Sequence, residues 1–156
     1  MKALLGRVVF TLITALAGQA AADGGGGSEP ARNERRSSDV EQAREAIERG
    51  DYPRAAGLLE RYTRREPEDA DAWNWLGFSR RKAGALEAAF VAYRRALAID
   101  PSHRGAHEYV GEAFLAAGDF ASAEKHLADL AALCPAGCEQ RADLAAAIAR
   151  YRAGRP

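Results

Sequence analysis

Residues 70–103 read ADAWNWLGFSRRKAGALEAAFVAYRRALAIDPSH, and the stretches on both sides of them, 36–69 and 104–137, repeat their pattern. Stepping by 34 residues from one copy to the next lands on one residue type or size class in five registers. These registers hold Gly50, Gly84 and Gly118; Tyr52, Leu86 and Phe120; Ala55, Ala89 and Ala123; Leu59, Tyr93 and Leu127; and Pro67, Pro101 and Pro135. A fixed period of this length is typical of a repeat array, in which each unit buries its apolar face only by stacking on a neighbour.

Each copy predicts two helices joined by a turn, and the second copy does so most clearly. Trp73 and Gly77 are four residues apart and therefore share one face of a first helix. Gly84 ends that helix, because glycine accepts the left-handed backbone that often closes a helix. Pro101 ends the second helix, since the residue before a proline disfavours helical backbone. Small residues at Gly77 and Ala89 predict that the two helices approach closely.

These columns resemble the tetratricopeptide repeat family, whose pattern runs from an aromatic residue through Leu-Gly and Ala to Pro. The second copy carries nearly the whole pattern in Trp73, Leu76, Gly77, Ala89, Tyr93, Ala96 and Pro101. The third copy has His107 at the register of Trp73, and the first copy departs most, in its first helix. The resemblance covers about 37–137 and implies an all-α fold, with three tandem helix-turn-helix units in a right-handed solenoid.

The start of the chain, residues 1–22, has the features of a secretory signal peptide. Lys2 and Arg7 precede an apolar run at 8–17, and the alanines at 20–22 suit cleavage. The apolar run is shorter than the roughly 20 residues that a membrane-spanning helix needs. The sequence therefore predicts an exported protein, periplasmic or secreted, that starts near Asp23 and has no stable membrane insertion.

The remaining residues divide into a linker and one repeat domain. Residues 23–36 are rich in glycine and in charge, which predicts a flexible linker. The repeat domain is expected over 37–153, and a capping box at Ser38 is expected to open its first helix. After the repeats at 36–69, 70–103 and 104–137, residues 138–153 predict a capping helix that covers the apolar end of the last repeat.

The charge of the chain argues against one class of partner. Its 22 basic and 22 acidic residues balance, whereas a nucleic-acid-binding domain concentrates basic residues on one surface. We therefore expect a protein or peptide partner and no nucleic acid.

The two cysteines, Cys134 and Cys138, lie at the turn between the last repeat and the capping helix. In an exported chain such a pair most often forms a disulfide, which here would fix the angle of the capping helix. The spacing C-x3-C leaves two alternatives open. Two thiolates can bind Cu(I) together with a histidine, for which His126 is the candidate, and the pair can also carry redox chemistry.

The histidines and the standard catalytic motifs give no active site. His103 and His107 are spaced i, i+4, which can bind a metal, but no carboxylate or cysteine beside them in sequence completes a ligand set. We interpret His107 as a core residue, because it occupies the register of Trp73. The chain has no nucleophile elbow, metalloprotease motif, phosphate-binding loop or dinucleotide fingerprint. The sequence therefore indicates no catalytic residue, cofactor or metal.

The tryptophans predict where a partner binds. Trp73 and Trp75 project about 200° apart on a helix, so we expect that they do not share one core and that Trp75 faces the concave groove. In the family this groove receives peptides or helices. By register it would present Val40, Arg44, Ile47, Asn74, Trp75, Phe78, Arg81, Lys82, Glu108, Tyr109, Glu112 and Leu115. The alternative is that Trp75 and Phe78 pack against the linker or a neighbouring repeat.

The composition of the predicted groove suits a protein-binding surface, with aromatic residues at its centre and charged residues at its edges. A subclass of the family grips a terminal carboxylate with a clamp of lysine, asparagine and arginine. That clamp is absent here, because the matching registers hold Val40, Arg44, Trp75, Gly105 and Tyr109. The sequence thus predicts a non-catalytic periplasmic adaptor, and the alternative is a copper- or redox-handling factor of the cell envelope.

Overall fold

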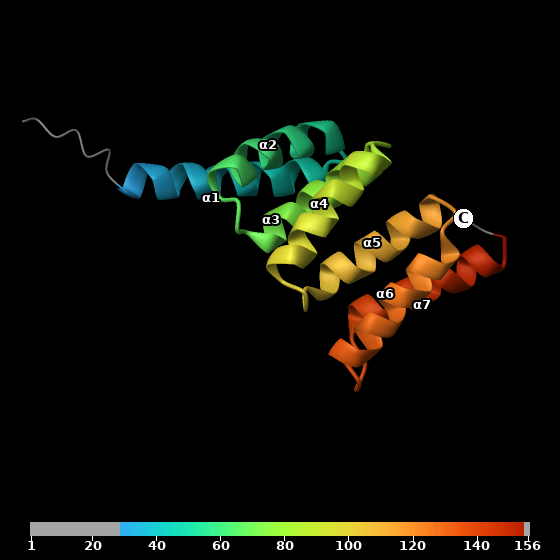
Figure 1. Cartoon of the computed structure of the whole chain (residues 1–156). Coiled ribbons are helices and arrows are strands. Elements are labelled where there is room, and N and C mark those ends of the chain that lie inside the picture. Colours follow the sequence, from blue (N-terminus) through green and yellow to red (C-terminus); the bar gives the residue numbers. More distant parts are fainter. Residues whose placement is uncertain (1–28, 155–156) are drawn as a thin grey trace, which may run out of the picture.

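The computed structural model describes residues 29–154, and the side chains of 38–154, as seven helices with no strand in that range (Figure 1). The helices are α1 (Glu29–Glu48), α2 (Tyr52–Arg65), α3 (Ala70–Lys82), α4 (Leu86–Ile99), α5 (Arg104–Ala116), α6 (Phe120–Leu133) and α7 (Glu139–Arg152). The starts of α3 and α5 lie 34 positions apart, and so do those of α2, α4 and α6. The predicted all-α fold of helix pairs is confirmed.

The same residue types recur at the starts of several helices and in the turns between paired helices. Asp51, Asp69 and Asp119 stand before α2, α3 and α6, and each side chain accepts a hydrogen bond from a backbone N–H of the first turn. In the turns between paired helices the backbone is left-handed, with φ of 82° at Gly84 and 79° at Gly118. Glycine adopts this conformation without steric cost, so each turn reverses the chain in the same way.

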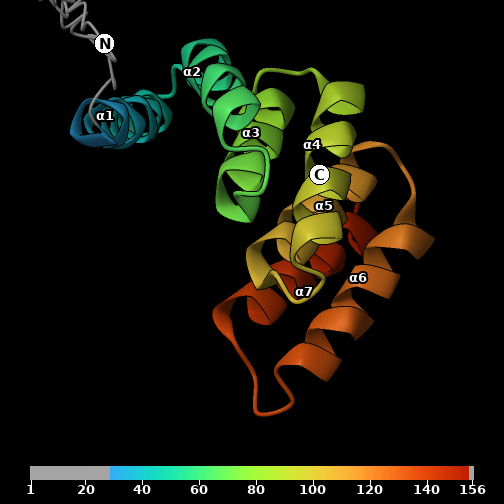
Figure 2. The same cartoon turned by 60° about the vertical axis from the view of Figure 1, so that its left-hand side comes forward.

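The helix pairs stack into an elongated array. Each first helix packs against its own second helix, and α3 also contacts α5, while α5 contacts α7 (Figure 1). The view turned by 60° shows α1 nearly end-on at one extreme of the array, with α6 and α7 at the other (Figure 2). The first helices α3 and α5 and the helix α7 therefore form one continuous inner face.

The buried residues form three clusters, and each cluster spans two neighbouring units. The first joins α1 and α2 to α3 and α4, the second joins α4 to α5, and the third joins α6 to α7. Leu144 and Ile148 of α7 complete the third cluster together with Leu130 of α6. This packing is what a capping helix provides, because the apolar side of the last repeat would otherwise face water.

Helix α3 approaches α4 at the predicted small residues. Ala89 is fully buried, and a Cβ atom added to Gly77 would lie 2.5 Å from ring atoms of Tyr93. Gly111 holds the same register one repeat later but allows a different approach, since its added Cβ would lie 2.6 Å from Leu144 of α7. The expected close approach is confirmed.

The expected linker and helix start are wrong where the structure describes them. Helix α1 begins at Glu29, so residues 29–36 are helical. Pro30 stands in the first turn, where proline is well tolerated, and the residues after it include good helix formers. Ser38 consequently lies inside the helix, where Gln42 Nε2 donates a hydrogen bond of 2.8 Å to its Oγ, and the expected capping box does not open α1.

The predicted signal peptide and the glycine run that follows it lie outside the described residues. Within residues 29–154, no helix combines the length with the apolar character that crossing a bilayer requires.

We expect Gly77→Ala to lower the free energy of unfolding by about 1–3 kcal/mol, because the new methyl group collides with the fully buried ring of Tyr93. A matched control is Gly57→Ala in α2, where an added Cβ meets only the end of the Arg61 side chain, at 4.0 Å. That change should raise stability by about 0.5–1 kcal/mol, since alanine is the better helix former. Urea unfolding of both variants measures the difference, and equal shifts in one direction would contradict the assigned packing.

Candidate functional site

Four aromatic rings meet on the inner face of the array and form what we call the aromatic cluster: Tyr52, Trp75, Phe78 and Tyr109. Trp75 and Phe78 lie about one turn apart on α3 with ring centroids separated by 5.8 Å. Tyr109 repeats the register of Trp75 on α5, and its ring lies 6.2 Å from Trp75 and 5.0 Å from Phe78. These tilted and edge-on contacts hold the rings in place. All four rings remain partly exposed.

Contrary to the sequence prediction, Trp73 and Trp75 do not pack on separate parts of the protein. Both are half-buried, and both pack against the first core cluster. Trp73 donates its indole N–H to the carbonyl of Pro67 at 2.9 Å, whereas Trp75 turns toward Phe78 and Tyr109. The expectation that they cannot share a core is wrong in this form, because the cluster is wide enough for one indole at each edge.

The charged residues at the centre of the predicted groove form an ion pair between neighbouring repeats. Arg81 of α3 donates to a carboxylate oxygen of Glu112 of α5 at 2.6 Å. The Arg81 guanidinium also lies over the rings of Phe78 and Tyr109, with centroid distances of 5.6 and 6.0 Å. Its charge is therefore compensated inside the protein and does not form a free basic edge.

Three hollows run along the inner face around these rings. The first, of about 730 Å³, lies between α3, α5 and the start of α7, and it contains the predicted Asn74, Trp75, Glu108 and Tyr109. The second, of about 550 Å³, is lined by the predicted Val40, Arg44, Ile47 and Trp75. The third, of about 410 Å³, is lined by the predicted Arg81, Lys82, Glu112 and Leu115. Trp75 forms a wall of both the first and the second hollow.

Several residues that line the hollows were missed by the sequence analysis. The first hollow is also lined by the acidic residues Glu68, Asp69, Asp71 and Asp100, and the third by Ala147, Arg150 and Tyr151 of α7. The acidic residues belong to the connections before α3 and α5 or to the first turn of α3. The sequence did contain a signal for the α7 residues. Adding 34 to the residue numbers of α5 beyond Arg104 gives positions in α7, which indicates that α7 extends the inner face.

A buried carboxyl and a buried amide form the floor of the first hollow. Burial, and after it the nearby carboxylates of Glu112, Asp143 and Glu139, raise the pKa of Glu108 to about 7 against the opposing charge of Arg81. The side-chain oxygen of Asn74 is buried and has no hydrogen-bond partner among the described residues. Carboxyl groups outnumber basic groups around the hollow, because Glu68, Asp69, Asp71, Asp100 and Glu108 line it together with Arg104 and His103. Two of the carboxylates are already paired, Glu68 with Arg95 and Asp71 with His103.

The two cysteines lie apart from this face. Their Cα atoms are 6.0 Å apart at the α6–α7 turn, within the range that a disulfide spans. The Sγ of Cys134 lies 2.9 Å from the carbonyl of Leu130. His126 does not join the cysteines, because its Nδ1 faces Nδ1 of His107 at 3.0 Å. Within residues 29–154, no group of three potential metal ligands includes either cysteine, so the alternative of a Cu(I) site with His126 is not assembled.

The histidine pair that the sequence analysis considered does not converge on one point. His103 accepts the backbone N–H of Ala106 at the start of α5, and its Nε2 lies 3.1 Å from Asp71. His107 is buried, as its register predicted, and its ring turns toward α6 instead.

Comparisons with known proteins agree with this geometry. A family model described as tetratricopeptide repeat matches residues 40–104 and 92–137. No match was found among curated protein sequences.

Solved structures of similar fold include the TPR2B-domain:pHsp70 complex of yeast Sti1, which is 18% identical, with 78% of this chain and 99% of that chain covered and a TM-score of 0.71. Another is the type III secretion chaperone SycD of Yersinia enterocolitica with a peptide of the translocator YopD, at 18% identity, 83% and 98% coverage and a TM-score of 0.67. The second TPR domain of human RPAP3 with an HSP70 peptide has 18% identity, 77% and 97% coverage and a TM-score of 0.68. At these identities the likeness shows the fold alone.

The raised pKa of Glu108 predicts a pH-dependent effect of Glu108→Gln. The folded state binds this proton more tightly than the unfolded state, where the pKa is near 4.5, so the contribution of Glu108 to stability falls as pH rises from about 4.5 to above 7. The glutamine variant cannot lose a proton. It should therefore gain stability relative to the wild type at pH 8, by about 1–2 kcal/mol once water in the open hollow has screened part of the effect.

The measurement is the free energy of unfolding of both proteins at pH 5 and pH 8. Glu87→Gln, at an exposed glutamate of α4, is the control for loss of one negative charge. A gain from Glu108→Gln that is the same at both pH values would contradict the raised pKa.

Proposed function

The chain belongs to the tetratricopeptide repeat family, and we propose that it is a non-catalytic periplasmic adaptor that binds a segment of a partner protein along its inner face. The observation that carries the proposal is the aromatic cluster. Its rings belong to α2, α3 and α5, are fixed by contacts with one another, and keep part of their surface exposed between the hollows.

Rings of this kind suit a binding surface for an energetic reason. Ordering a mobile side chain on binding costs roughly 0.5–1.5 kcal/mol, and rings already held by their neighbours avoid most of that cost. Aromatic residues and arginine also carry most of the free energy in protein interfaces. Phe78 contacts the other three rings, whereas Trp75 contacts two of them and also forms a wall of two hollows, so Trp75 is the ring that a bound segment would reach.

Among the similar structures, the Sti1 domain is in a complex with pHsp70, the RPAP3 domain binds an HSP70 peptide, and SycD binds a peptide of the translocator YopD. We propose the same mode of binding here, with a segment of the partner in the groove. The chemistry of the segment differs from an acidic tail. Because five carboxyl side chains line the first hollow, against only Arg104 and His103 on the basic side, it fits basic side chains and other hydrogen-bond donors.

Export and a disulfide complete the proposal. Lys2, Arg7 and the apolar run after them support cleavage after Ala22 and delivery to the periplasm. The separation of Cys134 and Cys138 supports a disulfide in that oxidising compartment. The bond would connect the end of α6 to the start of α7, and it would hold the capping helix against the last repeat.

The binding role is tested with peptides selected from a random displayed library against the mature protein. We expect selected peptides to contain basic residues, and we expect Trp75→Ala to weaken their binding by at least about 2 kcal/mol, roughly thirtyfold in Kd. The reason is that removing the indole opens the wall between two hollows and removes two ring contacts. Isothermal titration calorimetry gives the Kd.

Val91→Ala is the matched control, because Val91 is a large apolar side chain, 52% exposed, that lines none of the three hollows. It should leave the Kd unchanged. Thermal melts confirm that Trp75→Ala is folded at the temperature of the titration, since this residue also packs on the first core cluster. Equal losses from the two variants would overturn the assignment of the binding face.

The export proposal is tested by the intact mass of the protein recovered from the periplasm. We expect a chain that starts at Asp23 and is lighter by two hydrogen atoms than its reduced form, because Cys134 and Cys138 are joined. Mass spectrometry before and after reduction measures both features. Recovery only in the cytoplasm with Met1 present would overturn the proposed location, and an unchanged mass on reduction would overturn the disulfide.

A further inference from the structure

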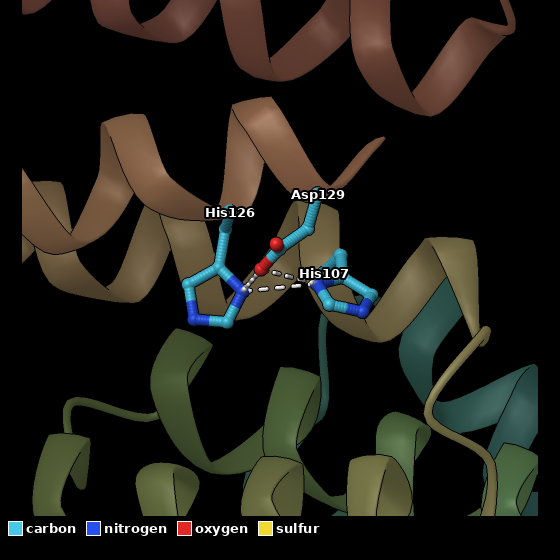
Figure 3. A group of neighbouring side chains, drawn as sticks. All are labelled: His107, His126 and Asp129. Atoms are coloured by element: carbon cyan, nitrogen blue, oxygen red, sulfur yellow. Dashed lines mark hydrogen bonds and ion pairs between the residues drawn. The ribbon is translucent and has the colours of Figure 1, made fainter. Parts of the chain in front are cut away.

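Three side chains of the third repeat converge on one point between α5 and α6. His107 projects from α5, and His126 and Asp129 project from α6 toward it (Figure 3). The Nδ1 atoms of the histidines are 3.0 Å apart, and Asp129 Oδ2 lies 3.7 Å from that of His107 and 3.8 Å from that of His126. This cluster lies outside the inner groove, because none of its three residues lines any of the three hollows described above.

The hydrogen bond on the far side of His107 fixes which of its nitrogens can bind a metal. Its Nε2 lies 3.0 Å from the carbonyl of Pro101. A carbonyl only accepts, so Nε2 carries the proton and donates it. Trp73, at the same register one repeat earlier, donates its indole N–H to Pro67 in the same way. Nδ1 of His107 therefore presents a lone pair toward His126, and the ring is oriented by the kind of outer hydrogen bond that accompanies metal-bound histidines.

The other ring and the carboxylate are also well placed. The His126 ring stacks on Phe114 with a centroid distance of 5.6 Å and an interplanar angle of 17°. The side chains of His107 and His126 are only 9% and 16% exposed, whereas Asp129 is 41% exposed. The cluster thus has a buried side made of the two rings and an open side beside the carboxylate.

The repeat pattern singles out these three positions. At the registers of His107, His126 and Asp129, the second repeat has Trp73, Ala92 and Arg95. Trp73 and Ala92 belong to or pack on the same core cluster, and Arg95 donates to the carbonyl of Pro67 and to Glu68. The third repeat has therefore replaced two apolar residues and a cation by three potential metal ligands at one place in space.

The spacing of the three atoms fits a metal ion. Distances of 3.0, 3.7 and 3.8 Å define a triangle with a centre about 2.05 Å from each corner, and Zn–N and Zn–O bonds measure about 2.0–2.2 Å. Ligand atoms of a tetrahedral ion with such bonds lie about 3.4 Å apart, close to the mean of the three distances. On one face of an octahedral ion they would all lie about 3.0 Å apart, so the tetrahedral geometry fits better.

We propose that His107, His126 and Asp129 form a Zn²⁺ site, with water in a fourth position on the open side. Binding requires a lone pair on both Nδ1 atoms, so the proton now shared between the two rings moves to Nε2 of His126 or to solvent. The ion would join α5 to α6. Because Glu108 and Tyr109 follow His107 on α5, the site would hold the third-repeat part of the binding face in place.

The experiment titrates Zn²⁺ into the mature chain and into variants by isothermal titration calorimetry in a buffer that does not bind metal. We expect one ion per chain for the wild type. His126→Ala and Asp129→Asn should each weaken binding by at least tenfold, since each removes one of three ligands. His126→Ala places at this position the residue that the second repeat already has, so the fold is expected to accept it.

Two controls separate this site from other sources of zinc binding. His103→Ala removes the histidine that lies outside the cluster, and the double variant Cys134→Ser, Cys138→Ser removes both thiols. Both should retain stoichiometric binding, and Zn²⁺ should raise the Tm of the wild type but not that of His126→Ala. Absence of stoichiometric binding would overturn the proposal. So would binding that survives both His126→Ala and Asp129→Asn, or binding that is lost in the cysteine variant.

Discussion

The burial of apolar side chains between neighbouring units is the interaction on which the rest of the structure depends. The first two buried clusters each cross from one repeat to the next, and the third crosses from the last repeat to α7. A unit alone could not bury these side chains, so its stability is tied to its neighbour. This shared packing fixes the distance between successive first helices. Gly77 and Gly111 show how closely the helices pack, since neither leaves room for one more carbon atom: Gly77 faces Tyr93 of α4, and Gly111 faces Leu144 of α7.

The packing of the helices also fixes where the side chains outside the core lie. The inner face holds the aromatic cluster in one arrangement, and an ion pair between Arg81 and Glu112 connects two repeats beside it. Acidic groups of the connections gather at one end of this face, where burial and the carboxylates of Glu112, Asp143 and Glu139 raise the pKa of Glu108. Within the third repeat, the packing of α5 on α6 brings His107 against His126, which are 19 residues apart in the sequence. Rigid packing thus produces both the proposed groove and the proposed metal site.

The sequence predicts much of this fold because its signals are local and repeated. A glycine with positive φ and a proline at constant intervals place the turns, and one small residue per helix places the contacts. It predicts less where the outcome depends on what another unit contributes. The pairing of Arg81 with Glu112 depends on the angle between repeats, which a single helix does not encode. The start of α1 was mispredicted because Ser38 has the local features of a cap, while the residues before it are themselves able to form helix. His126 and Asp129 could have been recognised as unusual from the sequence, since the equivalent positions of the second repeat hold chemically different residues.

The two tryptophans of the chain allow a direct test of whether a partner segment binds along the aromatic cluster on the inner face, as we propose. In a ¹H–¹⁵N NMR spectrum each indole N–H gives its own signal, assigned with a Trp73→Phe variant. Trp73 is held by Pro67 at one edge of the core, and Trp75 lies in the wall between two hollows. On titration with a selected basic peptide, we expect the Trp75 signal to shift in proportion to occupancy while the Trp73 signal stays in place. A shift of Trp73 alone, or of neither indole at saturation, would contradict it.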